Sequence, residues 1–244
     1  MDSQHDTSHG GRSDRARRRS VVSYVQRGGR MTVGQQRAWD RSWASFGCDV
    51  TELGDGPIDF DAWFGRTAPV VLEIGSGMGE TTAELASISP EINHVAVEVY
   101  AAGLGQLVMR AEKLELENLR LVRGDAVDLL RAHIAPNSLH GVRVFYPDPW
   151  PKKRHHKRRL IQPGFVRLVA SRIEPGGTLH LATDWEDYAE QMLEVCEAEP
   201  LLRNQHADQQ GGWAPRPVWR PLTKFESRAE REGRVSRDVI FERV

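Results

Sequence analysis

The sequence predicts an α/β fold in which a mostly parallel sheet is covered by helices on both faces. From residue 70 onward, short apolar segments alternate with helical ones. Strands buried on both faces appear as continuous apolar runs, and 70–74 (Val-Val-Leu-Glu-Ile) is such a run. A glycine-rich turn follows this strand at 75–79. In open parallel sheets, ligands bind at such strand ends, so the turn also predicts a ligand site.

The expected elements follow one another with short connections. The first strand leads to a helix at 80–89, which Pro90 ends because proline cannot continue a helix. Strands connected through helices in this way are joined by right-handed crossovers. The remaining expected strands lie at 94–99, 119–122, 139–146, 178–182 and 238–242. The remaining expected helices lie at 101–116, 126–133, 163–173 and 185–199.

Composition indicates one globular domain with a polar tail. The chain has 244 residues, of which 39% are hydrophobic, enough for one sizeable core. Residues 1–24 contain little to bury and many arginines, so we expect a disordered basic tail followed by a single domain at 25–244. No apolar run approaches the length of a membrane span, so no membrane partner is expected. The two cysteines, Cys48 and Cys196, fit a reducing cytoplasm.

The glycine turn and the residue after it favour one class of ligand. Gly75, Gly77 and Gly79 let the backbone approach a ligand closely. A dinucleotide fingerprint would need a further glycine at position 80, where the chain has Glu80. A carboxylate at a helix N-terminus repels a pyrophosphate. The pattern therefore favours S-adenosylmethionine, which has no phosphate, over a nicotinamide dinucleotide.

Acidic residues in or at the ends of three successive strands support this ligand. Glu73, just before the glycine turn, is placed to bind the cationic amino-acid end of S-adenosylmethionine, directly or through water. Glu98 can accept hydrogen bonds from both ribose hydroxyls, and Asp125 can accept one from the adenine amine. Each acid alone would be an ordinary surface carboxylate, but three beside a glycine turn indicate a binding site.

The segment at 146–159 predicts a pocket for a base that is still attached to its nucleic-acid backbone. Prolines on both sides of Asp148 fix its position at a strand end, and Tyr146 and Trp150 offer flat faces for stacking. The basic run at 152–159 offers phosphate contacts. These features occur together in one strand-end loop, which favours a nucleic-acid substrate over a solvated charge patch.

Here the sequence resembles the bacterial tRNA (guanine-N7)-methyltransferase family over roughly residues 25–244. The resemblance rests on motifs at 73–80, 146–163, 182–188 and 223–226 and on an entry segment at 29–37. Two departures from the family pattern are Tyr100 and Gly164, and we expect neither to touch a ligand-binding group. The resemblance implies a Rossmann-like class I methyltransferase fold with a mostly parallel seven-stranded sheet.

The resemblance also implies an activity: transfer of methyl from S-adenosylmethionine to N7 of the guanosine at position 46 in the tRNA variable loop, leaving S-adenosylhomocysteine. It assigns Glu73, Glu98, Asp125 and Asp148 to the cofactor site. The residues that it implies for the substrate are Lys152, Asp184, Thr223, Lys224, Phe225 and Glu226. Asp148 is the expected catalytic residue, because positive charge moves onto the guanine ring during transfer. Asp148 or Asp184 would accept hydrogen bonds from the guanine edge, and Lys152 would hold a phosphate or guanine O6.

Two other functions remain open from sequence alone. A methyltransferase acting on an exocyclic amine uses a similar proline–aromatic loop, although Trp150 follows the second proline here. The other alternative is a basic RNA-binding module with a vestigial cofactor fold, against which the intact acids argue. No metal is expected, because His155 and His156 lack partners at ligand spacing. The sequence leaves a monomer and a homodimer equally open.

Overall fold

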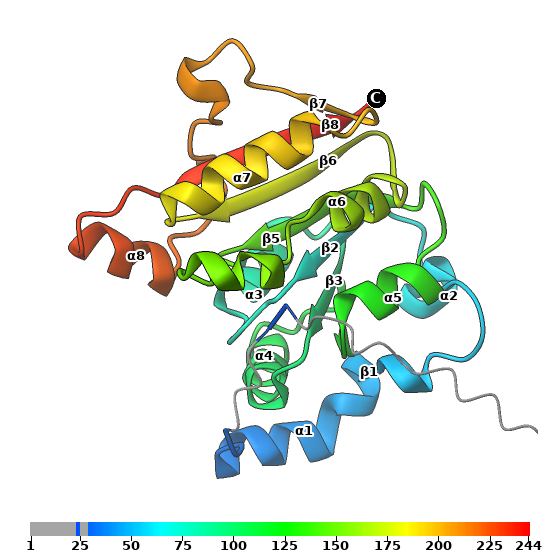
Figure 1. Ribbon diagram of the computed structural model, residues 1–244. Helices are drawn as coiled ribbons and strands as arrows, with labels where there is room; N and C mark the ends of the chain where they lie inside the picture. Colours follow the sequence, from blue (N-terminus) through cyan, green and yellow to red (C-terminus); the bar gives the residue numbers. More distant parts are fainter. Residues whose placement is uncertain (1–22, 25–28) are drawn as a thin grey trace, which may run out of the picture.

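The computed structural model of the chain describes residues 23–24 and 29–244, so nearly all of the expected tail lies outside the described residues. Eight strands form one sheet in the order β1-β4-β3-β2-β5-β6-β8-β7 (Figure 1). The first six strands pair in parallel, and β8 pairs antiparallel with both β6 and β7. The strands are β1 Gly47–Asp49, β2 Val70–Ile74, β3 Asn93–Glu98, β4 Leu119–Arg123, β5 Leu139–Phe145, β6 Ile173–Thr183, β7 Leu202–Asn204 and β8 Arg237–Arg243.

Helices cover both faces of the sheet, as predicted (Figure 1). One face packs against α1, α3 and α4, and the other against α2, α5, α6 and α7. The helices are α1 Val33–Phe46, α2 Phe60–Phe64, α3 Glu80–Ile88, α4 Ala101–Lys113, α5 Ala126–Ala132, α6 Pro163–Ala170, α7 Glu186–Glu197 and α8 Lys224–Arg231. No helix within the described ranges combines the length and apolarity that crossing a bilayer requires.

The sheet has eight strands where seven were predicted, and it differs from the prediction at its edges. The edge strands β1 and β7 have three residues each, too few to show an alternating pattern. Strand β6 begins at Ile173, five residues before the expected start, and runs through Pro175, Gly176 and Gly177. Proline and glycine normally interrupt strands, so the residue types do not indicate this early start.

The strand order places a crevice at the middle of the sheet. From β2 the chain moves outward through β3 and β4, then returns to build β5 and β6 on the other side of β2. Ligands in open parallel sheets bind where the order reverses, outside the carboxyl ends of the strands. All five residues of β2 are buried, so this central strand is held rigidly from both sides. The glycine turn that follows β2 therefore starts from a fixed point.

One face of the sheet carries a row of buried and half-buried ionisable side chains in place of apolar ones. Glu73, Arg143 and His180 are in direct register on β2, β5 and β6. Asp238 on β8 shares this face and lies against His180. Buried charges require partners, so this row must be paired across the sheet. It lies directly beneath the strand ends that form the candidate site.

Candidate functional site

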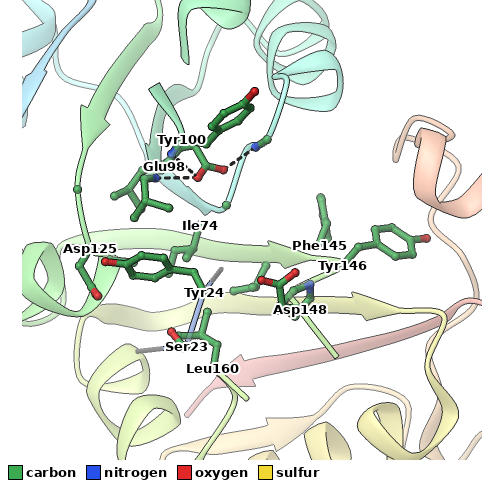
Figure 2. A pocket seen from close by; sticks show the side chains of 18 residues that line it. Ser23, Tyr24, Ile74, Glu98, Tyr100, Asp125, Phe145, Tyr146, Asp148 and Leu160 are labelled. Carbon is green, nitrogen blue, oxygen red and sulfur yellow. Dashed lines mark hydrogen bonds between the residues drawn. The ribbon is translucent and has the colours of Figure 1, made fainter. Parts of the chain in front are cut away.

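A strand-end pocket lies at the carboxyl ends of β2, β3, β4 and β5 (Figure 2). Five of the predicted cofactor residues line it: Gly75, Gly77, Glu98, Asp125 and Asp148. In the view of Figure 2, Asp125 and Asp148 lie at opposite ends of the pocket, with Glu98 between them and above. Glu73 and Gly79 are the two predicted residues that do not line the pocket; they support it from behind.

The backbone conformation of the turn at 75–79 requires glycine at two positions. Gly77 and Gly79 have φ angles of 56° and 69°, in the left-handed region that favours glycine. A Cβ atom on Gly79 would also lie 2.6 Å from the Leu107 side chain of α4, so this position allows no side chain. Glu80 then opens α3 and pairs with Arg110 at 2.7 Å. Its repulsion of a phosphate is therefore weaker than the sequence alone indicates.

Glu98 holds the glycine turn in place. Its carboxylate accepts a hydrogen bond from Gly77 N at 2.9 Å, and from the amides of Val99 and Tyr100 at 2.7 and 2.9 Å. A carboxylate has about four acceptor positions, so about one remains for a ligand. Binding both hydroxyls of a ribose would require one backbone contact to open. Tyr100 itself lines the pocket, so the expectation that it lies away from the ligand-binding groups was wrong.

Asp125 caps α5 and faces the pocket. It accepts a hydrogen bond from Val127 N at 2.7 Å, which fixes its side chain at the end of β4. Tyr24 extends into the same pocket, with its hydroxyl beside Asp125 in Figure 2. Partial burial, together with the negative charges of Asp125 and Asp128, raises the pKa of Tyr24. This contact could not be predicted, because about a hundred residues separate Tyr24 from Asp125 in the sequence.

Glu73 is buried beneath the turn. Its side chain lies in the row of ionisable groups, and burial raises its pKa to about 7, although the charge of Arg143 and a hydrogen bond from Thr82 act to lower it. The protonated form is thus accessible near neutral pH. A cation arriving above Glu73 would favour the ionised form.

The loop at 146–151, here called the substrate loop, contains two strained residues. Tyr146 and Trp150 have φ angles of 53° and 46°, which side-chain-bearing residues rarely adopt. They lie on either side of Pro147, Asp148 and Pro149, and Trp150 donates from its indole to the carbonyl of Ser23 at 3.2 Å. Strain of this kind persists where the surroundings fix the backbone, and it concentrates at functional sites. The loop therefore holds Asp148 rigidly at the pocket wall.

Arg159 fixes the substrate loop from below. The sequence assigned it to the phosphate-binding run, but it is buried and bound within the protein, so that assignment was wrong. Its guanidinium donates to Pro149 O and to both carboxylate oxygens of Asp187, each at 2.9 Å, and it lies over the Tyr188 ring. The loop is thereby joined to α7. The other cations of the run, at 152–154 and 157–158, are exposed.

Asp184 lines a second hollow, which shares Pro151 with the substrate loop. Trp185, Arg234 and Arg237 also line it. Arg234 donates to the Asp184 carboxylate at 2.8 Å, a pairing that the sequence could not indicate because fifty residues separate the two. The hollow combines apolar walls with three carboxylates, Asp184, Glu186 and Asp187, and two arginines.

The motif at 223–226 forms the start of α8. Thr223 caps the helix by accepting from Glu226 N at 3.0 Å. Glu226 is buried and bound by Arg216 and Arg220, so its carboxylate faces the protein interior. The side chains of Lys224 and Phe225 lie outside the described part of the structure. Contact between this motif and a substrate therefore stays a prediction.

The charged side chains that line the strand-end pocket are all acidic. Glu98, Asp125 and Asp148 line it, and no lysine or arginine does so among the described residues. Apolar side chains, including Ile74, Val97 and Leu160, form the rest of the wall. Such a pocket suits a ligand that has an adenosine-like body and a positive charge, and it opposes a pyrophosphate. Within the described ranges, no three His, Cys, Asp or Glu side chains gather closely enough to hold a metal ion.

Two solved structures resemble this fold. TrmN from Thermus thermophilus has a TM-score of 0.50 and 19% identity, over 73% of this chain and 45% of its own. The 16S rRNA methyltransferase KamB also has a TM-score of 0.50, with 16% identity over 77% of this chain and 95% of its own. At these identities the likeness concerns the fold, which is that of class I methyltransferases.

Sequence relatives are much closer. A family described as "Putative methyltransferase" matches residues 67–239. A tRNA (guanine-N(7)-)-methyltransferase from Alkalilimnicola ehrlichii is 51% identical over 92% of this chain and 93% of its own length. The enzymes of that name from Bordetella pertussis and Streptomyces coelicolor are 53% and 50% identical, over 92% and 93% of this chain and 85% and 82% of their own lengths. The chain belongs to the family of tRNA (guanine-N(7)-)-methyltransferases.

Proposed function

We propose that this protein transfers a methyl group from S-adenosylmethionine to N7 of the guanosine at position 46 of tRNA. The observation that carries the proposal is the anionic strand-end pocket, free of lysine and arginine among its described residues, next to a rigid loop with a cationic surface. Membership of the family supports the same reaction. We further propose that the chain acts in the cytoplasm as a single domain, 25–244, preceded by a basic tail whose last residues, Ser23 and Tyr24, join the strand-end pocket.

The residues of the strand-end pocket fit S-adenosylmethionine. Ile74, Val97 and Leu160 would contact the faces of adenine, and Asp125 would accept from its amine. Glu98 would bind the ribose through its remaining acceptor position. Glu73, buried below the turn, would stabilise the ammonium end through the local field, without direct contact. When bound, S-adenosylmethionine supplies an electrophilic methyl group, whose bond to sulfur breaks as the bond to guanine N7 forms.

The protein's main tasks in this reaction are orientation and charge stabilisation. Guanine N7 has a lone pair and no proton, so no general base is needed to expose it. The substrate loop places Asp148 at the pocket wall, where positive charge arrives on the purine ring as the methyl group moves. A fixed carboxylate at that point stabilises the transition state more than the ground state. We assign this role to Asp148.

Asp184 provides the selection of guanine. Guanine carries donors at N1 and at its exocyclic amine, whereas adenine offers an acceptor at N1. A carboxylate facing that edge therefore accepts guanine and rejects adenine. Pro151 and Trp185 would contact the base in the hollow around Asp184, and Arg237 would contact a phosphate there. The base must leave its stack in folded tRNA to reach this position, at a cost of a few kcal/mol.

Mapping of the methylated atom tests the proposal. Unmodified tRNA transcripts with guanine or adenine at position 46 are incubated with the protein and S-adenosylmethionine. Borohydride reduction and aniline cleavage then break the chain only at N7-methylguanosine. We expect cleavage at position 46 of the guanine transcript and no methyl transfer to the adenine transcript. Methylation of an exocyclic amine, or binding without transfer, would replace this proposal with one of its alternatives.

The exposed cations after the substrate loop are expected to bind tRNA phosphates. Replacing Arg154 and Lys157 together by alanine should weaken tRNA binding and flatten the plot of log Kd against log salt by about one to two units, because two counterion-releasing contacts are lost. Filter binding at several salt concentrations measures the slope.

The matched control for this test is replacement of Lys113 and Arg131 by alanine. These two exposed cations end α4 and α5, at the opposite edge of the sheet from the strand-end pocket. Their removal should leave the slope unchanged, although it changes the net charge equally. Equal slopes for both double variants would show that the cations at 152–158 do not contact tRNA phosphates.

A further inference from the structure

Arg220 is the most deeply buried cation of the described chain and lies outside both pockets. Its side chain has 0% exposure. The guanidinium binds Glu226 through two parallel hydrogen bonds of 2.8 Å and donates to Asp238 at 3.0 Å. A buried guanidinium is stable only when carboxylates of fixed geometry satisfy it. Glu226 belongs to α8 and Asp238 to β8, so Arg220 joins a helix to the sheet strand that follows it.

The cluster around Arg220 is balanced in charge. Arg216 also donates to Glu226, at 2.7 Å, and His180 lies 2.6 Å from Asp238. Burial lowers the pKa of His180, although the hydrogen bond to Asp238 acts to raise it, so the imidazole is neutral and can donate from Nε2. Two arginines therefore face two carboxylates. Each carboxylate also keeps a second partner if Arg220 is replaced, and a variant at this position is thus expected to fold.

The same guanidinium reaches the substrate loop. Its Nη1, which also donates to Glu226, donates to the hydroxyl of Tyr146 at 3.4 Å, and that hydroxyl lies 3.0 Å from the hydroxyl of Ser236. Tyr146 is the strained residue directly after β5, a wall of the strand-end pocket, and two residues before Asp148. The arginine also lies 5.9 Å from the centre of the Tyr146 ring. Its position and that of the loop are therefore coupled.

We infer that Arg220 is a positioning residue for methyl transfer, which fixes the Tyr146 end of the substrate loop relative to the start of α8. It touches neither ligand pocket and acts through Tyr146 and Glu226. The inference rests on the proposed function and adds to it a link between Asp148 and the predicted substrate motif at 223–226. Without that link the loop and the helix would each keep their fold but lose their mutual alignment.

The test compares Arg220→Lys, Arg220→Met and Tyr146→Phe in steady-state methylation well below the melting temperature. Lysine keeps the charge but not the planar fork, and phenylalanine removes only the hydroxyl. We expect kcat to fall at least tenfold in both Arg220 variants and about threefold in Tyr146→Phe. The Kd of S-adenosylhomocysteine should stay within threefold, because Arg220 contacts the pocket only through Phe145 and Tyr146 and none of the acids assigned to the cofactor.

A double-mutant cycle separates positioning from stability. If Arg220 acts through Tyr146, Arg220→Met should lower kcat by a smaller factor in the Tyr146→Phe background than in the wild type. Arg172→Lys is the control for loss of an arginine fork away from the site: Arg172 is half-buried just before β6 and donates to Leu130 O at 2.8 Å. This variant should lower the melting temperature without changing kcat.

Two results would overturn the inference: a kcat within twofold of wild type in both Arg220 variants, or effects of Arg220 and Tyr146 that multiply independently. Both are measured relative to an active wild-type enzyme. A wild type that transfers no methyl group would instead contradict the proposed function, so the two failures are distinguishable.

Discussion

Asp148→Asn is expected to lower kcat for tRNA methylation by about a hundred- to a thousandfold. The amide keeps the shape of the carboxylate but removes the charge that stabilises the methylated purine as it forms. Asp148 lies at the pocket wall in a loop that Arg159 clamps to α7, so the substitution should leave the loop in place. The Kd of S-adenosylhomocysteine should therefore remain within about tenfold, since the ring and ribose contacts are elsewhere.

Single-turnover kinetics and calorimetry measure these two quantities separately. Asp128→Asn is the matched control, because Asp128 is an exposed carboxylate of α5 that does not line the strand-end pocket. It should leave the single-turnover rate unchanged. A normal rate in Asp148→Asn would remove this carboxylate from the chemistry and leave it a purely structural role.

Gly103→Ala is expected to weaken cofactor binding by about ten- to a hundredfold and to lower stability. A Cβ atom on Gly103 would lie 2.1 Å from the carbonyl oxygen of Gly77, and backbone cannot move aside as a flexible side chain can. The first turn of α4 or the glycine turn must therefore shift. Overpacking of this kind costs about 1–3 kcal/mol. If this cost destabilises the cofactor-bound state, it corresponds to the expected loss of affinity.

Calorimetry with S-adenosylhomocysteine and thermal unfolding measure both effects. Gly164→Ala is the same substitution in α6, where a Cβ would meet nothing within 4 Å. It should raise stability by about 0.5–1 kcal/mol, because alanine favours helix, and leave the Kd unchanged. Equal affinities for the two alanine variants would show that the close contact between α4 and the turn is unimportant for binding.

The central part of the fold and the convergence of the predicted acids at one pocket were predictable because both depend on local pattern. Apolar runs locate strands, and the carboxyl ends of parallel strands meet at one edge of a sheet, so Glu98 and Asp125 had to converge. The polar helices α1 and α8 gave no such pattern. Their few apolar residues pack against elements that are distant in the sequence, and the sequence does not show which elements these are.

The roles of arginines were not predictable. In sequence, Arg159 is one of several cations in a basic run, and Arg220 lies in a proline-containing stretch that looks like a surface loop. Both are buried because carboxylates from other elements surround them: Asp187 binds Arg159, and Asp238 and Glu226 bind Arg220. Most of these partners are 18 to 28 residues away, a separation at which residue type alone does not specify contact.

Replacement of a single atom of the substrate tests most directly the central claim, which is that N7 of the guanosine at position 46 accepts the methyl group. A tRNA carrying 7-deazaguanosine at position 46 has a carbon in place of N7 and keeps N1, O6 and the exocyclic amine. We expect the guanosine tRNA to accept one methyl group per molecule, and the deaza tRNA to accept none while it still competes for binding. Methylation of the deaza tRNA at a rate equal to that of the guanosine tRNA would contradict the claim.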